Sequence, residues 1–154
     1  MATKVLVTGS RNLTPSDVAM MAIFDLFAEE DKSYQLIHGM CPGADTLAAL
    51  EAARRGWNVS CDSPDWKRYG YSASYMSMIS MTKTNPEIVV GFIKGKSFGV
   101  KKCLKLVKKL KSVKIIYLWD EGILHTLTPD KLNAYWKRRY DEKKNQLVEN
   151  FSQT

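Results

Sequence analysis

Short apolar runs alternate with helical patterns along most of this chain, and this alternation limits the fold more than any other feature. Five runs predict β-strands, namely Lys4–Thr8, Tyr34–His38, Asn58–Cys61, Ile88–Ile93 and Val113–Trp119. The stretches between them predict helices over Pro15–Glu30, Ala44–Arg55, Ser72–Thr82 and Val100–Leu110. Strands and helices that alternate in this way form a doubly wound, mainly parallel sheet with right-handed crossovers. We therefore expect an α/β fold.

The segment after residue 120 follows a different pattern. A turn at residues 120–122 is followed by Ile123–Leu127, which predicts an antiparallel edge strand. Thr128 and Pro129 then begin an added C-terminal helix. We expect residues 1–120 to form the main domain, and residues 121–154 to pack on that same domain as an edge strand and helix.

The composition is typical of one compact domain. The 154 residues are 45% apolar and 25% charged, which is enough for a sizeable core. No run is long and apolar enough to span a bilayer, and the first strand follows Met1 almost at once, so we expect a cytoplasmic protein without membrane contact. Three Cys residues form an odd set without metal-ligand spacing. They favour reduced thiols, and we expect no metal site and no cofactor.

The formal net charge of +7 is concentrated in two segments. Residues 94–114 contain nine Lys and no acidic residue, and a second basic cluster lies at residues 137–144. Basic surfaces attract polyanions, from nucleotides to nucleic acid. Lys-rich helix faces are also common as plain solvated surfaces, so charge alone leaves both alternatives open.

Residues 35–45, QLIHGMCPGAD, join a strand to a helix through a Gly-rich turn. Such a junction directs backbone N–H groups and the positive end of a helix dipole at one point, which suits a phosphate. Gly39 and Gly43 permit φ > 0 and a close approach of ligand to backbone. Asp45 either caps the helix or accepts hydrogen bonds from a sugar hydroxyl. The alternative is an ordinary strand-to-helix turn.

Two further Gly-containing loops follow apolar strands, Gly9–Leu13 after the first and Lys94–Gly99 after the fourth. Ligands of doubly wound sheets lie beyond the carboxyl ends of the strands, at the switch point. We therefore expect these two loops and Gly39–Ala44 to form one pocket that binds an anion. The residues expected to contact the ligand are Gly9, Ser10, Arg11, Gly39, Gly43, Ala44, Asp45, Trp66, Lys96, Ser97 and Gly99.

Particular roles follow from residue type. The N–H and hydroxyl of Ser10 are expected to face a phosphate that Arg11 clamps in bidentate fashion, the alternative for Arg11 being a surface salt bridge. Lys96, Ser97 and the N–H groups around Gly99 are expected to hold a second anion.

An irregular stretch, residues 62–71, is rich in aromatic residues. Trp66 is expected either to stack on a base or to act as a lid over the core. Asp65 is either a turn residue or a ligand of the sugar. If the protein is an enzyme, Asp45 and Asp65 are the carboxylates that could carry its proton transfer.

Four motifs, VTGSR, HGMCPGAD, PDWKRYG and SFGVKK, occur in this order and at a spacing that resembles the SLOG superfamily, with the YspA-like branch as the nearest pattern. The resemblance covers roughly residues 3–118. It implies a Rossmann-like sheet that binds a nucleotide or nucleotide-derived ligand. Relatives in that superfamily include phosphoribohydrolases, sensors of NAD-derived signals and a DNA-processing protein, and related domains often complete the site across a subunit interface. The resemblance thus implies a homo-oligomer.

The chain departs from the family pattern at positions that the hydrolytic relatives use. The Arg-Asn pair that YspA-like sequences usually carry at the start of the helix expected over Ser72–Thr82 is absent from residues 73–78, and Gly99-Val100 replaces the Gly-Thr of the phosphate loop. Lys101 and Lys102 stand where the hydrolytic relatives place a Glu. These changes favour a protein that senses or sequesters its ligand.

Three functions remain open from the sequence. The first is binding of a nucleotide-derived small molecule through the three loops. The second is hydrolysis of the glycosidic or phosphate bond of such a ligand. The third is nucleic-acid binding through the basic helices Val100–Leu110 and Pro129–Glu149, whose aromatic residues alternatively dock the last helix on the domain.

Overall fold

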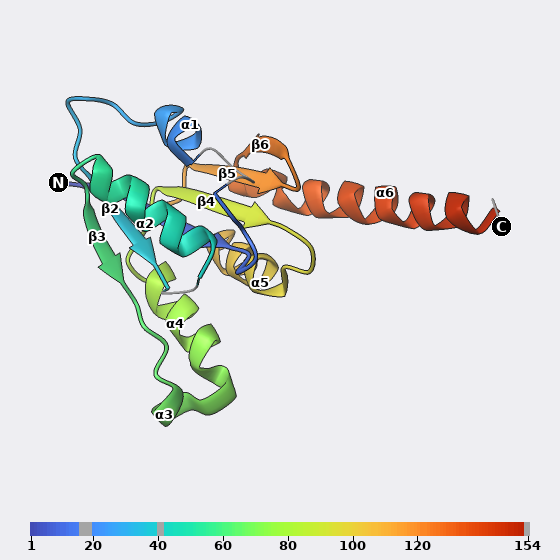
Figure 1. The fold of residues 1–154 in the computed structure, drawn as a ribbon, viewed down its shortest axis with the longest axis horizontal. Coiled ribbons are helices and arrows are strands. Elements are labelled where there is room, and N and C mark those ends of the chain that lie inside the picture. Colours follow the sequence, from blue (N-terminus) through green and yellow to red (C-terminus); the bar gives the residue numbers. More distant parts are fainter. Residues whose placement is uncertain (16–19, 40–41, 153–154) are drawn as a thin grey trace.

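A computed structural model describes residues 1–15, 20–39 and 42–152. Residues 151 and 152 are described by their backbone alone. Six strands form one sheet in the order β3-β2-β1-β4-β5-β6 (Figure 1). The strands are β1 (Thr3–Gly9), β2 (Tyr34–His38), β3 (Asn58–Cys61), β4 (Ile88–Ile93), β5 (Ile115–Asp120) and β6 (Ile123–Leu127). Strands β1 to β5 are parallel and β6 is antiparallel to β5. The expected α/β class and the antiparallel edge strand are confirmed.

The helices of the described chain lie between and after these strands. They are α1 (Met20–Asp25), α2 (Ala44–Arg54), α3 (Trp66–Tyr69), α4 (Ala73–Thr82), α5 (Phe98–Val107) and α6 (Leu132–Ser152), with short 3-10 turns at Gly70–Ser72 and Pro129–Lys131. None of these described helices combines the length and the apolar character that crossing a bilayer requires.

Alternate residues of the central strands supply two separate cores. Val5 and Val7 of β1 face a cluster that contains Phe24 of α1 and Ala48 of α2, whereas Leu6 faces the cluster on the opposite side. That second cluster contains residues of α4, α5 and the start of α6. Helices thus cover both faces of the sheet, as expected for a doubly wound fold.

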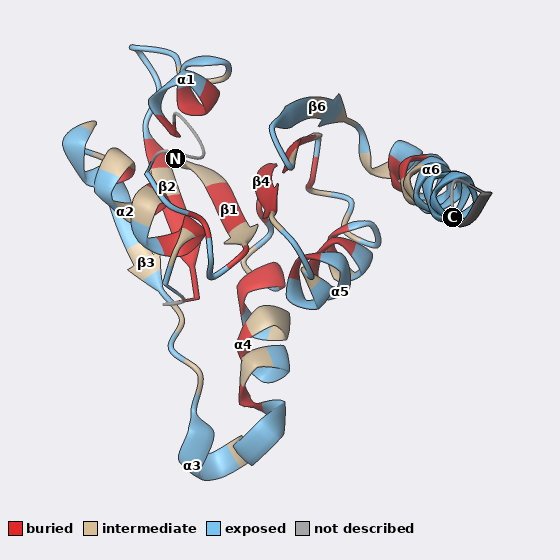
Figure 2. Cartoon of the chain, turned by 45° about the vertical axis from the view of Figure 1, so that its right-hand side comes forward, coloured by how far each residue is buried: buried red, intermediate tan, exposed pale blue. Residues whose placement is uncertain are grey.

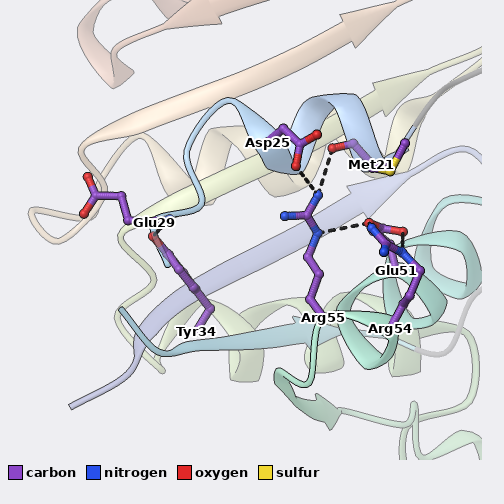
Figure 3. Close-up of polar contacts among 7 residues, drawn as sticks. All are labelled: Met21, Asp25, Glu29, Tyr34, Glu51, Arg54 and Arg55. Carbon is purple, nitrogen blue, oxygen red and sulfur yellow. Dashed lines mark hydrogen bonds and ion pairs between the residues drawn. The ribbon is translucent and has the colours of Figure 1, made fainter. Parts of the chain in front are cut away.

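Arg55 joins α1 to α2. Its guanidinium donates to the carbonyl oxygen of Met21 (3.0 Å) and to the carboxylate of Asp25, and its Nε donates to Glu51 Oε1 (3.0 Å) (Figure 3). The same guanidinium lies 5.8 Å from the ring centroid of Phe24. These contacts fix the position of α1 beside α2 on one face of the sheet.

The helix expected over Pro15–Glu30 is shorter than expected at its C-terminal end. It ends at Asp25, and residues 16–19 lie outside the described residues. The Tyr34 hydroxyl accepts from the N–H of Glu29 (3.0 Å) and donates to the carbonyl of Phe27 (3.1 Å). These bonds hold the chain in turns that replace the last helical turn.

Helix α6 packs on the sheet only at its start. Leu132 and Tyr135 are buried in the second core and Trp136 packs against it. Residues 141–150 are all exposed, and the helix extends away from the sheet (Figures 1 and 2). The aromatic residues at the start of this helix therefore dock it on the domain. This is the alternative to a nucleic-acid surface that the sequence analysis left open.

Candidate functional site

A cavity of about 430 Å³ lies at the carboxyl ends of β1 and β4. Its walls come from the loop after β1 (Gly9–Asn12), from Gly39 after β2, from residues 96–99 after β4, and from α4. Strands β1 and β4 are neighbours, and their following helices cover opposite faces. This is the switch point of the sheet, where doubly wound folds bind ligands. We call this space the loop cavity.

Ser10 links the loops around the loop cavity. Its N–H donates to the carbonyl of Phe92 (3.1 Å) and its hydroxyl donates to the carbonyl of Lys94 (3.2 Å). Its own carbonyl accepts from the N–H of Ala44 (3.3 Å). The N–H and hydroxyl expected to face a phosphate are thus engaged within the chain. Ser10 holds the loops after β1, β2 and β4 in one arrangement.

Close packing requires glycine at two positions beside Ser10. A Cβ at residue 9 would lie 2.4 Å from the Cβ of Ala44. Gly43 has a φ of 79°, and a Cβ there would lie 2.5 Å from the carbonyl oxygen of Ser10. Gly43 and Ala44 therefore pack directly against the backbone of the loop after β1. Gly39, in contrast, lacks a positive φ, and its nearest neighbour is the terminal methyl of Met81.

Asp45 lies in the first turn of α2 and is 4% exposed. Its Oδ2 accepts a hydrogen bond from the N–H of Gly39 (2.9 Å), which ties the turn after β2 to the helix. No side-chain cap bond is made at this helix start within the described residues. Because Asp45 also lines the loop cavity, a sugar hydroxyl there could reach its carboxylate.

The N-terminus of α5 opens onto the loop cavity without a cap. Ser97 precedes the helix, and its hydroxyl bonds to the backbone of Lys94 instead of the helix. Phe98, Gly99 and Val100 form the first turn and line the cavity. First-turn N–H groups have no partner within a helix. The first-turn donors and the positive end of the helix dipole therefore lie at the cavity wall.

Two exposed cations stand beside this helix end. Arg11 and Lys96 both line the loop cavity. Within the described residues, neither has an ion pair or a hydrogen bond from its side chain. A salt bridge was the alternative for Arg11, and none forms among these residues. Both side chains are available to an anion.

Asp65 and Trp66 lie away from the loop cavity. Asp65 caps α3 by accepting from the N–H of Arg68 (3.1 Å) and lines a different hollow. Trp66 is 54% exposed on α3, which stands out from the sheet beside the start of α4 (Figure 2). Neither belongs to the described residues that line the loop cavity. The turn alternative for Asp65 agrees with this placement.

One wall of the loop cavity was missed by reasoning from the sequence. Ser74, Ser77 and Met78 of α4 line it. The hydroxyl of Ser77 donates to the backbone carbonyl of Asp62 (2.9 Å), which fixes the chain leading to α3. Small residues three apart on a predicted helix were the available signal, because they permit close approach to a cavity.

Residues 3–69 match the model of the YspA, cpYpsA-related SLOG family. Over this segment the chain is similar to that family. We call residues 3–69 the SLOG segment. It runs from β1 to α3 and contains the loops after β1 and β2. The expected resemblance is confirmed for these residues, while the loop after β4, α5 and α6 lie beyond the match.

One relative extends past the SLOG segment. The Gene 61 protein of Mycobacterium phage D29 is 27% identical over 111 residues, which cover 69% of this chain and 89% of that protein. No solved structure matches the chain.

Proposed function

We propose that this protein binds a nucleotide-derived small molecule in the loop cavity and holds its phosphate at the N-terminus of α5. The observation that carries the proposal is the uncapped first turn of α5, which faces a cavity of about 430 Å³. Helix N-termini bind phosphate through free N–H groups and the helix dipole. The match to the SLOG family over residues 3–69 supports a nucleotide derivative as the ligand.

Arg11 and Lys96 complete the phosphate site in this proposal. Both are exposed residues on the cavity wall, and a guanidinium binds phosphate through two parallel hydrogen bonds. The ribose then lies against the carboxylate of Asp45. Asp45 is already held by the N–H of Gly39, so it is fixed before the ligand arrives.

Binding without turnover agrees best with the carboxylates present. Asp45 is the one carboxylate among the described residues that line the loop cavity. A phosphoribohydrolase needs a positioned group that protonates the departing base, and Asp65, the other candidate, lines a different hollow. We therefore propose a sensing or sequestering role.

Calorimetry with AMP, ADP-ribose and NAD tests the proposal. We expect saturable binding of at least one of them. The Arg11→Gln variant should weaken it about tenfold, because charge-assisted hydrogen bonds contribute roughly 1.5–3 kcal/mol. Arg68→Gln on α3 is the matched control and should bind as the wild type does. Absence of heat from all three ligands, together with no small molecule found by mass spectrometry of the purified protein, would contradict the proposal.

Gly99→Ala separates ligand binding from folding. A Cβ at residue 99 meets no atom of the chain within 4 Å, and Ala favours a helix over Gly by about 1 kcal/mol. We expect this variant to be at least as stable as the wild type and yet to bind AMP more weakly, since the methyl group enters the space of the phosphate. Unchanged affinity would place the phosphate elsewhere.

Turnover and assembly are tested directly. Chromatography after incubation with AMP should detect no free adenine. Release of adenine that disappears in Asp45→Ala would instead establish the hydrolase.

We also propose a homo-oligomer, which light scattering of the purified protein measures. The exposed part of α6 and the Met-rich α4 are its candidate contact surfaces.

A further inference from the structure

A second cavity, of about 370 Å³, adjoins the loop cavity on the side of α6. The two cavities share Lys96, Ser97 and Phe98, so the start of α5 separates them. The far walls of the second cavity come from Glu121 after β5 and from α6. We call it the α6 groove. It is built by a part of the chain that lies beyond the SLOG segment.

Positive charge dominates the α6 groove. Lys96, Lys101 and Lys143 line it, and within the described residues none of the three forms an ion pair. Glu121 is the acidic residue among the described residues that line it, and its carboxylate accepts a hydrogen bond from the N–H of Gly95 (2.9 Å). Three ammonium groups without an ion pair, against one carboxylate that already accepts a hydrogen bond, favour an anionic occupant.

Two aromatic side chains offer flat surfaces in the same groove. Phe98 is 71% exposed at the boundary between the two cavities. Trp136 is partly buried and held in place, since Lys101 Nζ lies 5.7 Å and the Arg139 guanidinium 6.0 Å from its ring centroid. Arg139 is fixed in turn by Asp120, at 2.7 Å. The exposed ring of Phe98 suits a nucleobase, because every base has a face that can stack, whereas the ring of Trp136 already carries two cations.

The excess of positive charge ends beyond the groove. The next hollow along α6 is lined by Asp120, Glu121 and Glu142 and by an equal number of cations, Arg138, Arg139 and Lys143, of which Arg139 is already paired with Asp120. A longer polyanion would therefore gain no net attraction there. The positive region therefore covers the loop cavity and the α6 groove, which is room for two nucleotides.

We propose that the α6 groove is a second nucleotide subsite and that the ligand is a dinucleotide lying across the start of α5. This inference rests on the proposed function, because one nucleotide occupies the loop cavity. The second base stacks on Phe98, beside the cations that lie over Trp136. The phosphate of the second nucleotide meets Lys101 and Lys143.

A length series tests the proposal. Calorimetry compares AMP, the dinucleotide pApA and an adenylate octamer under the same salt. We expect pApA to bind about tenfold more tightly than AMP, as expected for one added stacked base and its phosphate contacts. The octamer should bind no more tightly than pApA. Equal affinity for AMP and pApA would overturn the proposal, and so would affinity that rises further with the octamer, which indicates a nucleic-acid surface.

Paired variants locate the second subsite. Lys101→Gln combined with Lys143→Gln should reduce the affinity for pApA about fivefold or more and leave AMP binding unchanged. Lys108→Gln combined with Lys109→Gln removes the same charge at the other end of α5 and should change neither. Equal weakening of AMP and pApA by the first pair would overturn the second subsite alone. Absence of binding by both ligands to the wild type would overturn the proposed function and this inference together.

Discussion

Gly9 and Ala44 approach each other so closely that a Cβ at residue 9 would lie 2.4 Å from the Ala44 Cβ. This contact seats the start of α2 against the end of β1. We expect Gly9→Ala to destabilise the fold by about 1–3 kcal/mol through overpacking, measured by urea denaturation. Gly9→Ala combined with Ala44→Gly should cost less than the two single changes added together. Strict additivity would contradict a direct clash.

Ser10→Ala removes the side-chain hydrogen bond that joins the loop after β1 to the loop after β4. The Lys94 carbonyl loses the shorter of its two hydroxyl donors and keeps the Ser97 hydroxyl at 3.4 Å, and the N–H of Asn12 loses an acceptor at 3.2 Å. We expect a loss of about 1–2 kcal/mol in the free energy of unfolding. Ser112→Ala is the matched control, because the buried Ser112 hydroxyl has no partner among the described residues. The control should change stability by less than about 0.5 kcal/mol. Equal effects of the two substitutions would contradict the role given to Ser10.

Glu51 should make stability depend on pH. The hydrogen bond from Arg54 lowers the pKa of Glu51 below its ordinary value of 4.5. A carboxylate whose pKa is lower in the folded state stabilises the fold above its unfolded pKa, and this contribution is lost as the pH falls through the folded pKa. We expect Glu51→Gln to cost about 1–2 kcal/mol at pH 7, with a difference from the wild type that shrinks below pH 4.5. A difference that stays constant between neutral and acidic pH would argue against this ion pair.

The described cysteines should react very differently. Burial raises the pKa of the Cys103 thiol to about 12, whereas Cys61 is exposed. The thiolate is the reactive form. Iodoacetamide at pH 8 should therefore alkylate Cys61 and spare Cys103 in the native protein, as mass spectrometry of peptides would report. Both should be labelled in denaturant, and native labelling of Cys103 at the rate of Cys61 would contradict its burial.

Local sequence patterns predicted the sheet closely. The expected bounds of β2, β3, β4 and β6 agree with those observed, because apolar runs between turn residues set both ends of each strand. Gly56 takes a φ of 76° after α2, as a C-terminal glycine should. Helix α5 begins at Phe98, ahead of the expected Val100, since the carbonyl of Ser97 already accepts from the N–H of Lys101.

The site depended on contacts that no local pattern contains. The carbonyl groups that engage Ser10 belong to Phe92 and Lys94, on the neighbouring strand and its loop. Strand order brings these segments together, so the internal use of the Ser10 donors could not be seen from VTGSR alone. Asp65 was more accessible to prediction, because an Asp directly before a helical turn is a common N-cap.

The position of the phosphate is tested most directly by the backbone amides of α5. AMP added to ¹⁵N-labelled protein should shift the amide resonances of Phe98, Gly99 and Val100 along one saturation curve, because their N–H groups donate to the phosphate. In Arg11→Gln the same resonances should move only at higher AMP concentration. If AMP saturates the protein while these three resonances stay in place, the nucleotide binds elsewhere and the account of the loop cavity is wrong.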